Sequence, residues 1–112
     1  MTWQSALLEA YSPDEVSRAT QRLNDLETDL LNRRAELSQA EDVYTAVSNA
    51  VRSASLTPEV RTLLVTEMDF RYHALEQLRG KTAQAERRVE ETRLFLLRAY
   101  EVARVLQWRT VR

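Results

Sequence analysis

Residues that break regular structure are scarce in this 112-residue chain, which contains one glycine, two prolines and no cysteine. A β-sheet protein or a mixed α/β protein needs many tight turns, and glycine and proline supply most of them. Without cysteine there is no disulfide framework, thiol nucleophile or thiolate metal site. The scarcity argues against both sheet-containing classes and favours long helices, because Ala, Leu, Glu and Arg are abundant.

Membrane-spanning and export signals are also missing. The longest apolar run, Leu94 to Leu97, is far too short to cross a bilayer. The first residues, MTWQSALLEA, lack the basic start and the long apolar core of a signal peptide. We therefore expect a soluble, cytoplasmic protein with no membrane span.

Side chains that could carry catalysis or bind a cofactor are few. The single histidine, His73, has no cysteine or second histidine to complete a metal site. Gly-Lys-Thr at 80–82 lacks the second glycine and the preceding strand of a phosphate-binding loop. Neighbouring acids such as Glu90 and Glu91 fall on helix surfaces, whereas a paired-carboxylate active site needs a cleft. The sequence predicts a protein that is not an enzyme, with no catalytic residue, cofactor, metal or small-molecule substrate.

Both prolines stand in similar phrases, YSPDEV at 11–16 and SLTPEV at 55–60. Ser12 and Thr57 are suited to cap a helix, since a hydroxyl oxygen accepts a bond from a backbone N–H without a partner. Proline is tolerated at the next position, and the acid after it faces the positive end of the helix dipole. Ser12 and Glu15 also have the spacing of a capping box. The phrases predict a short helix at about 3–11, a long helix at about 13–54, a turn at 55–57 and a second long helix at about 58–111.

Both long helices repeat apolar residues every seven positions, at the a and d places of a heptad, which is typical of a coiled coil. We call these places the seam. In the first long helix they are Val16, Ala19, Leu23, Leu26, Leu30, Arg33, Leu37, Ala40, Tyr44, Val47, Val51 and Ala54. In the second they are Leu64, Met68, Arg71, Leu75, Leu78, Thr82, Ala85, Val89, Thr92, Leu96, Ala99, Ala103 and Leu106.

A turn of two or three residues forces the two long helices to run antiparallel. The sequence thus predicts an all-α fold, an antiparallel helical hairpin (coiled coil) in one domain, with the short N-terminal helix at its open end. The predicted layers set Leu37 against Leu78 and Tyr44 against Arg71, whose guanidinium could stack on the ring. We expect Arg33, Arg71 and Tyr44 to form polar layers in the core. These layers either fix the register, with the arginine head reaching water, or limit tight self-association and favour exchange of partners.

The C-terminal stretch RLFLLRAYEVARVLQWRTVR, residues 93–112, is more apolar than a two-helix hairpin can bury. Phe95, Tyr100 and Val102 are expected to widen the seam, but other apolar residues recur at helical spacing on a face that the seam does not use. The short N-terminal helix can shield only part of that face. We predict that a partner or a second copy covers the rest. The predicted interface comprises Trp3, Leu7, Leu94, Leu97, Val105 and Trp108.

A non-catalytic interaction protein, such as an adaptor, stalk or chaperone, is the function that these features favour. It would bind a protein partner, itself as a homodimer or larger assembly, or both. The alternative is a nucleic-acid-associated helical protein that uses Arg98, Arg104, Arg109 and Arg112. With a net charge of −1, the chain lacks the strong excess of basic residues that is usual in nucleic-acid-binding proteins.

Two long, charged, antiparallel helices joined near mid-chain, with runs such as QAERRVEETR at 84–93, resemble the FliJ/SctO-type stalk proteins of flagellar and type III secretion systems. Those proteins are coiled-coil hairpins that engage the export ATPase and carry chaperones. The chain is also similar, more generically, to small helical chaperones of type III secretion. The resemblance implies a stalk or chaperone of a bacterial secretion system, and it assigns no functional residue.

Overall fold

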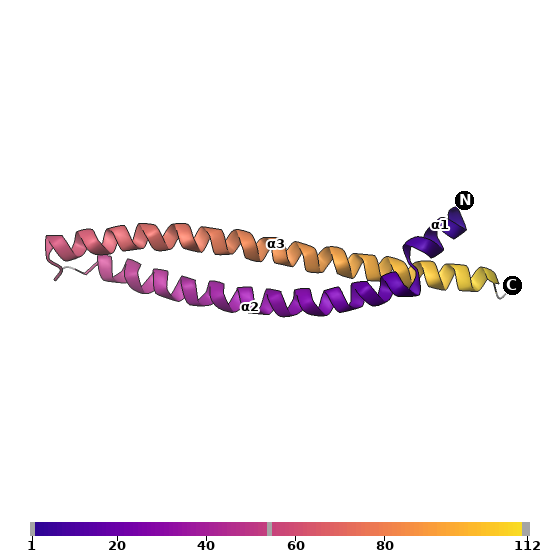
Figure 1. The fold of residues 1–112 in the computed structure, drawn as a ribbon. Coiled ribbons are helices and arrows are strands. Elements are labelled where there is room, and N and C mark those ends of the chain that lie inside the picture. Colours follow the sequence, from indigo (N-terminus) through magenta and orange to yellow (C-terminus); the bar gives the residue numbers. More distant parts are fainter. Residues whose placement is uncertain (1, 54, 111–112) are drawn as a thin grey trace. The chain divides into compact units, whose positions relative to one another are not determined.

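A computed structural model describes the backbone of residues 2–53 and 55–110, and their side chains up to residue 106. Three helices account for most of these residues: α1 (Trp3–Ala10), α2 (Pro13–Val51) and α3 (Pro58–Thr110). No strand occurs within the described ranges. Helices α2 and α3 run antiparallel, which confirms the predicted all-α helical hairpin (Figure 1).

Two compact units make up the chain, and each contains part of both long helices. The terminal unit comprises Met1–Thr28 and Glu86–Arg112, and so contains α1, the start of α2 and the end of α3. The turn unit comprises Asp29–Ala85, which is the turn with the adjoining parts of α2 and α3.

A hydroxyl side chain caps the start of each helix. The caps join Thr2 Oγ1 to the N–H of Ser5, Ser12 Oγ to the N–H of Glu15, and Thr57 Oγ1 to the N–H of Val60, at 3.1, 3.3 and 3.3 Å. Both proline phrases therefore begin helices as the sequence predicts. The Glu15 carboxylate pairs with Arg18 at 3.1 Å, so the structure shows the serine half of the capping box and a different partner for the acid.

Helix α2 ends at Val51, before the predicted end at Ala54, which lies outside the described residues. The N–H groups of Arg52 and Ser53 each donate to a carbonyl three residues earlier, at 3.2 and 3.1 Å, which is the spacing of a 3₁₀ turn. The guanidinium of Arg61, from the first turn of α3, donates to the carbonyls of Val51 at 3.2 Å and Ser53 at 3.0 Å. The bonds to Asn49, Ala50 and Val51 satisfy carbonyls that an α-helix leaves without partners at its C-terminus, and the bond to Ser53 holds the residue that follows the helix.

The seam contains all the side chains that the structure describes as buried. They are Ala19, Leu30, Leu75, Thr82, Ala85, Val89, Thr92 and Ala99. The other described seam residues are half-buried, except Arg71 and Ala103, which are exposed. Beside the seam of the terminal unit, Arg93 of α3 pairs with Glu27 of α2 at 3.2 Å, and both occupy the e place that flanks a coiled-coil core. The heptad register predicted from the sequence is therefore confirmed.

Two of the buried seam residues are threonines, whose hydroxyls need partners away from water. Thr82 donates to the carbonyl of Leu78 at 2.8 Å, and Thr92 donates to that of Arg88 at 2.9 Å. Each bond reaches back one turn within α3. Among the described residues, no buried side-chain nitrogen or oxygen lacks a hydrogen-bond partner.

The two arginines of the seam pair with acids on their own helices. Nε of Arg33 lies 2.8 Å from Oδ2 of Asp29, and Nε of Arg71 lies 2.8 Å from Oε1 of Glu67. The Arg33 side chain is 34% exposed and that of Arg71 is 45% exposed. Both guanidinium groups are therefore partly exposed to solvent, and each pairs with an acid one turn earlier in its own helix.

Tyr44 has an aromatic neighbour across the seam of the turn unit. Its ring lies 6.1 Å from the ring of Tyr72, centroid to centroid, with an angle of 51° between the planes. Tyr72 directly follows Arg71, the residue that the sequence places opposite Tyr44. The ring that meets Tyr44 in the structure is therefore that of Tyr72, and the Arg71 guanidinium is engaged with Glu67.

Candidate interaction surface

Exposed apolar side chains lie on α3 opposite the seam of the terminal unit. Leu94, Leu97 and Val105 are 55%, 63% and 44% exposed. At about 3.6 residues per turn these positions fall away from buried seam residues such as Thr92 and Ala99. We define the outer face of α3 by its exposed residues Arg87, Glu90, Glu91, Leu94, Leu97, Arg98, Glu101, Arg104 and Val105, with Tyr100 at its edge.

Tyr100 is 70% exposed, so the prediction that it widens the seam is wrong. It directly follows the buried Ala99, at a place beside the seam. The predicted layers end near there, because α2 begins only at Pro13 and provides no further residues to cover Tyr100 and Ala103. Phe95 and Val102, predicted with Tyr100, are half-buried.

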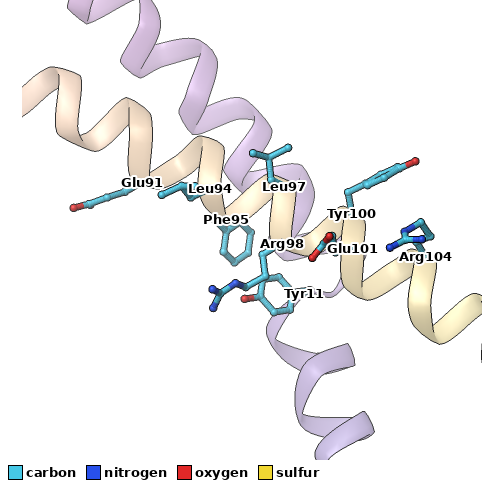
Figure 2. Close-up of a pocket in the computed structure, with 9 residues that line it drawn as sticks. All are labelled: Tyr11, Glu91, Leu94, Phe95, Leu97, Arg98, Tyr100, Glu101 and Arg104. Atoms are coloured by element: carbon cyan, nitrogen blue, oxygen red, sulfur yellow. The ribbon is translucent and has the colours of Figure 1, made fainter.

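A shallow groove of about 620 Å³ lies against this part of α3 (Figure 2). Tyr11, at the C-terminal end of α1, forms one wall, and its ring lies 5.0 Å from that of Phe95 between centroids. Figure 2 shows Leu97 and Tyr100 on the side of α3 away from Tyr11. The lining residues are Tyr11, Glu91, Leu94, Phe95, Leu97, Arg98, Tyr100, Glu101 and Arg104.

Helix α1 leaves the outer face open to solvent. None of its residues is buried; Trp3 is 52% exposed and Leu7 is half-buried. Five of the six predicted interface residues, two on α1 and three on α3, therefore lie in the terminal unit and keep at least part of their surface exposed. The side chain of Trp108, the sixth, lies outside the described residues.

Acidic and basic side chains are interleaved along the outer face. In chain order they are Arg87, Glu90, Glu91, Arg98, Glu101 and Arg104. A nucleic-acid surface instead gathers Lys and Arg without interleaved acids. The mixture is typical of the polar rim around an apolar protein-binding centre.

A second exposed apolar set lies in the turn unit, and the interface predicted from the sequence does not include it. Leu63 and Phe70 are 68% and 64% exposed, and Val60, one turn before Leu63, is 42% exposed. Leu63 and Phe70 stand seven residues apart at the heptad place before d. A large apolar residue repeated outside the a and d places was the signal that could have revealed this set.

The described part of the chain also contains neither a metal-binding cluster nor a helix suited to span a membrane. Within the described residues, no group of three His, Asp or Glu side chains could hold a metal ion. His73 is exposed, and its Nε2 lies 3.8 Å from Oδ1 of Asp69, one turn earlier. None of the described helices has the length and apolar character needed to cross a bilayer.

No protein-family model, curated protein or solved structure matches this chain. The resemblance to FliJ/SctO-type stalk proteins stays an expectation from architecture. Function is therefore inferred from the chain's own side chains, above all those of the outer face.

Proposed function

We propose that this chain is a non-catalytic protein–protein interaction protein and that the outer face of α3 is its binding surface. The supporting observation is the exposure of Leu94 and Leu97, at 55% and 63%, opposite a seam that already buries its own side chains. Burying a large aliphatic side chain is worth roughly 1.5–3 kcal/mol relative to full exposure. A partner that covers these side chains therefore gains free energy that the isolated hairpin cannot.

The form of the groove favours a macromolecular partner. A small-molecule site is a cleft that encloses most of its ligand, with a few convergent polar groups. This groove is lined by residues of α3 and by Tyr11 alone, and it has charged residues along its length. An elongated protein element, such as a helix, could contact its apolar centre and charged rim together.

A charged helical hairpin with an exposed binding face suits an adaptor, a stalk or a chaperone alike. The narrower proposal of a stalk or chaperone in a bacterial secretion system, acting in the cytoplasm, is supported by the resemblance of architecture.

Site-specific photocrosslinking in the source cell tests the proposed function. A photoreactive residue in place of Leu97 should crosslink to protein, and its yield should fall sharply when Leu94→Glu is added. The physical reason is that a carboxylate is costly to bury against an apolar partner. Mass spectrometry of the product identifies the partner, whether a second copy or another protein.

The matched control is the same photoreactive residue at Asn24, an exposed polar position of α2 in the same unit. Circular dichroism of the Leu94→Glu variant should show unchanged helix content. Crosslinking at Asn24 equal to that at Leu97, or no crosslinked protein from Leu97, would contradict the proposal.

A further inference from the structure

We infer that the outer face binds a second copy of this chain, with the two α3 helices antiparallel and related by a two-fold axis close to Leu94. This inference rests on the proposed function, because it takes the outer face as the binding surface. It adds the identity of the partner, the direction of its helix and the register.

The centre line of the outer face has a charge pattern suited to self-pairing. The residues Arg87, Glu91, Leu94, Arg98 and Glu101 follow one another at alternating spacings of four and three, so they form one straight stripe on the helix. All five are exposed. The stripe thus presents base, acid, leucine, base and acid in order.

Reversing this order places every charge opposite its complement. With Leu94 facing Leu94 of the second copy, Arg87 faces Glu101 of that copy and Glu91 faces its Arg98. A two-fold axis repeats each contact, because residue i meets j wherever j meets i. The register therefore gives four intermolecular ion pairs around a leucine pair.

A parallel arrangement would do the opposite. It would set each charged residue of the stripe against the same residue of the second copy, and like charges placed together oppose association. The charge order therefore selects the antiparallel direction. Leu97, beside the stripe and 63% exposed, would extend the apolar contact next to Leu94.

The charges of the stripe also differ from other charged pairs on the surface. Arg18, Arg71 and Arg79 each lie within 3.1 Å of an acid one turn earlier on their own helix. Arg87 and Glu91, and likewise Arg98 and Glu101, have the same spacings as those pairs. Among the described residues, none of these four side chains lies within 4.0 Å of an opposite charge. They are therefore available to a partner.

The contact spans about four helical turns, which is small for a protein interface, so we expect a dimer of micromolar affinity. Sedimentation of the purified full chain from about 10 to 500 µM should show this monomer–dimer equilibrium.

Arg98→Glu should raise Kd roughly tenfold, since it replaces two ion pairs with two repulsions. Adding Glu91→Arg should return Kd to near its original value, because the swapped charges pair again only in the antiparallel register. Arg18→Glu, on the exposed surface of α2, should leave Kd unchanged.

Single cysteines in this thiol-free chain report the direction. Leu94→Cys should form an intermolecular disulfide on oxidation, because the axis brings the two positions together. Val105→Cys should not, since antiparallel pairing would separate its two copies by roughly 30 Å along the helices. Crosslinking at both positions would mean a parallel dimer and would overturn the inference.

A strictly monomeric chain at the highest concentration, with no disulfide from Leu94→Cys, would also overturn it. The proposed function would survive that result if Leu97 still crosslinked to a different protein in cells. If both experiments gave no product, the proposed function would fail as well.

Discussion

Gly80, the only glycine of the chain, occupies an exposed position inside α3. Its φ is not positive, and a Cβ added there would meet no atom within 4 Å. Glycine in a helix costs about 1 kcal/mol relative to alanine, mainly through backbone entropy. Gly80→Ala should therefore raise the free energy of unfolding by about 0.5–1 kcal/mol, measured by urea denaturation followed by circular dichroism.

Ala83→Gly, at another exposed position of α3 in the turn unit, is the matched control and should lower the free energy of unfolding by a similar amount. If Gly80→Ala instead destabilised the chain, the helix would need the glycine for a bend or a close contact that the structure does not contain.

At the scale of single residues, the sequence predicted a contact best where both partners are close in the chain. The caps at Ser12 and Thr57 bind N–H groups three residues later, so local chemistry determines them. The partner of Tyr44 was not predictable in the same way. Tyr44 contacts Tyr72, whereas the Arg71 guanidinium pairs with Glu67. This outcome depends on how side chains that are far apart in the sequence pack across the seam.

At the scale of the helix, α2 has a nearly continuous apolar seam interrupted by Arg33. This side chain is 34% exposed and pairs with Asp29 at 2.8 Å. An exposed pair at this spacing is worth about 0.3–0.5 kcal/mol, less than the gain from placing a leucine in a partly buried apolar seam. Arg33→Leu should raise the free energy of unfolding by about 1 kcal/mol and the melting temperature by a few degrees.

Arg18→Leu is the control for this change. Arg18 also pairs with an acid one turn earlier, Glu15, but its side chain is 70% exposed and lies off the seam. Its replacement should not raise the melting temperature. A clear fall for Arg33→Leu would show that the guanidinium makes a contact that the seam requires.

The helix ends and faces were predictable to different degrees. The start of α3 at Pro58 follows from its cap, whereas the end of α2 at Val51 does not. No glycine or proline marks that end, and Arg61, ten residues further on, donates to the carbonyls of Val51 and of Ser53 just after it. Leu63 and Phe70 lie outside the a and d places, so the heptad seam did not predict this exposed pair.

For the whole molecule, the outer face stays exposed because α2 fills the seam on the other side of α3. The sequence predicted this arrangement because heptads over both helices and a short turn admit few other folds. The sequence could not identify a partner. Exposed leucines and interleaved charges indicate the chemistry of a binding surface, but many different proteins can have a surface complementary to it. The same hairpin could also form between two chains if the helices exchanged partners.

The most direct test is therefore a disulfide across the seam of the turn unit. Leu37 and Leu78 are half-buried seam residues of α2 and α3, and the predicted layers place them opposite each other. With both replaced by cysteine, oxidation at low protein concentration should give an intramolecular disulfide in a monomeric band on a non-reducing gel. The control pair, Leu31→Cys with Leu78→Cys, should not form it, because Leu31 is 66% exposed and lies off the seam. Exclusively intermolecular disulfides from the Leu37→Cys, Leu78→Cys variant would contradict the account, since α2 and α3 would then pair between chains.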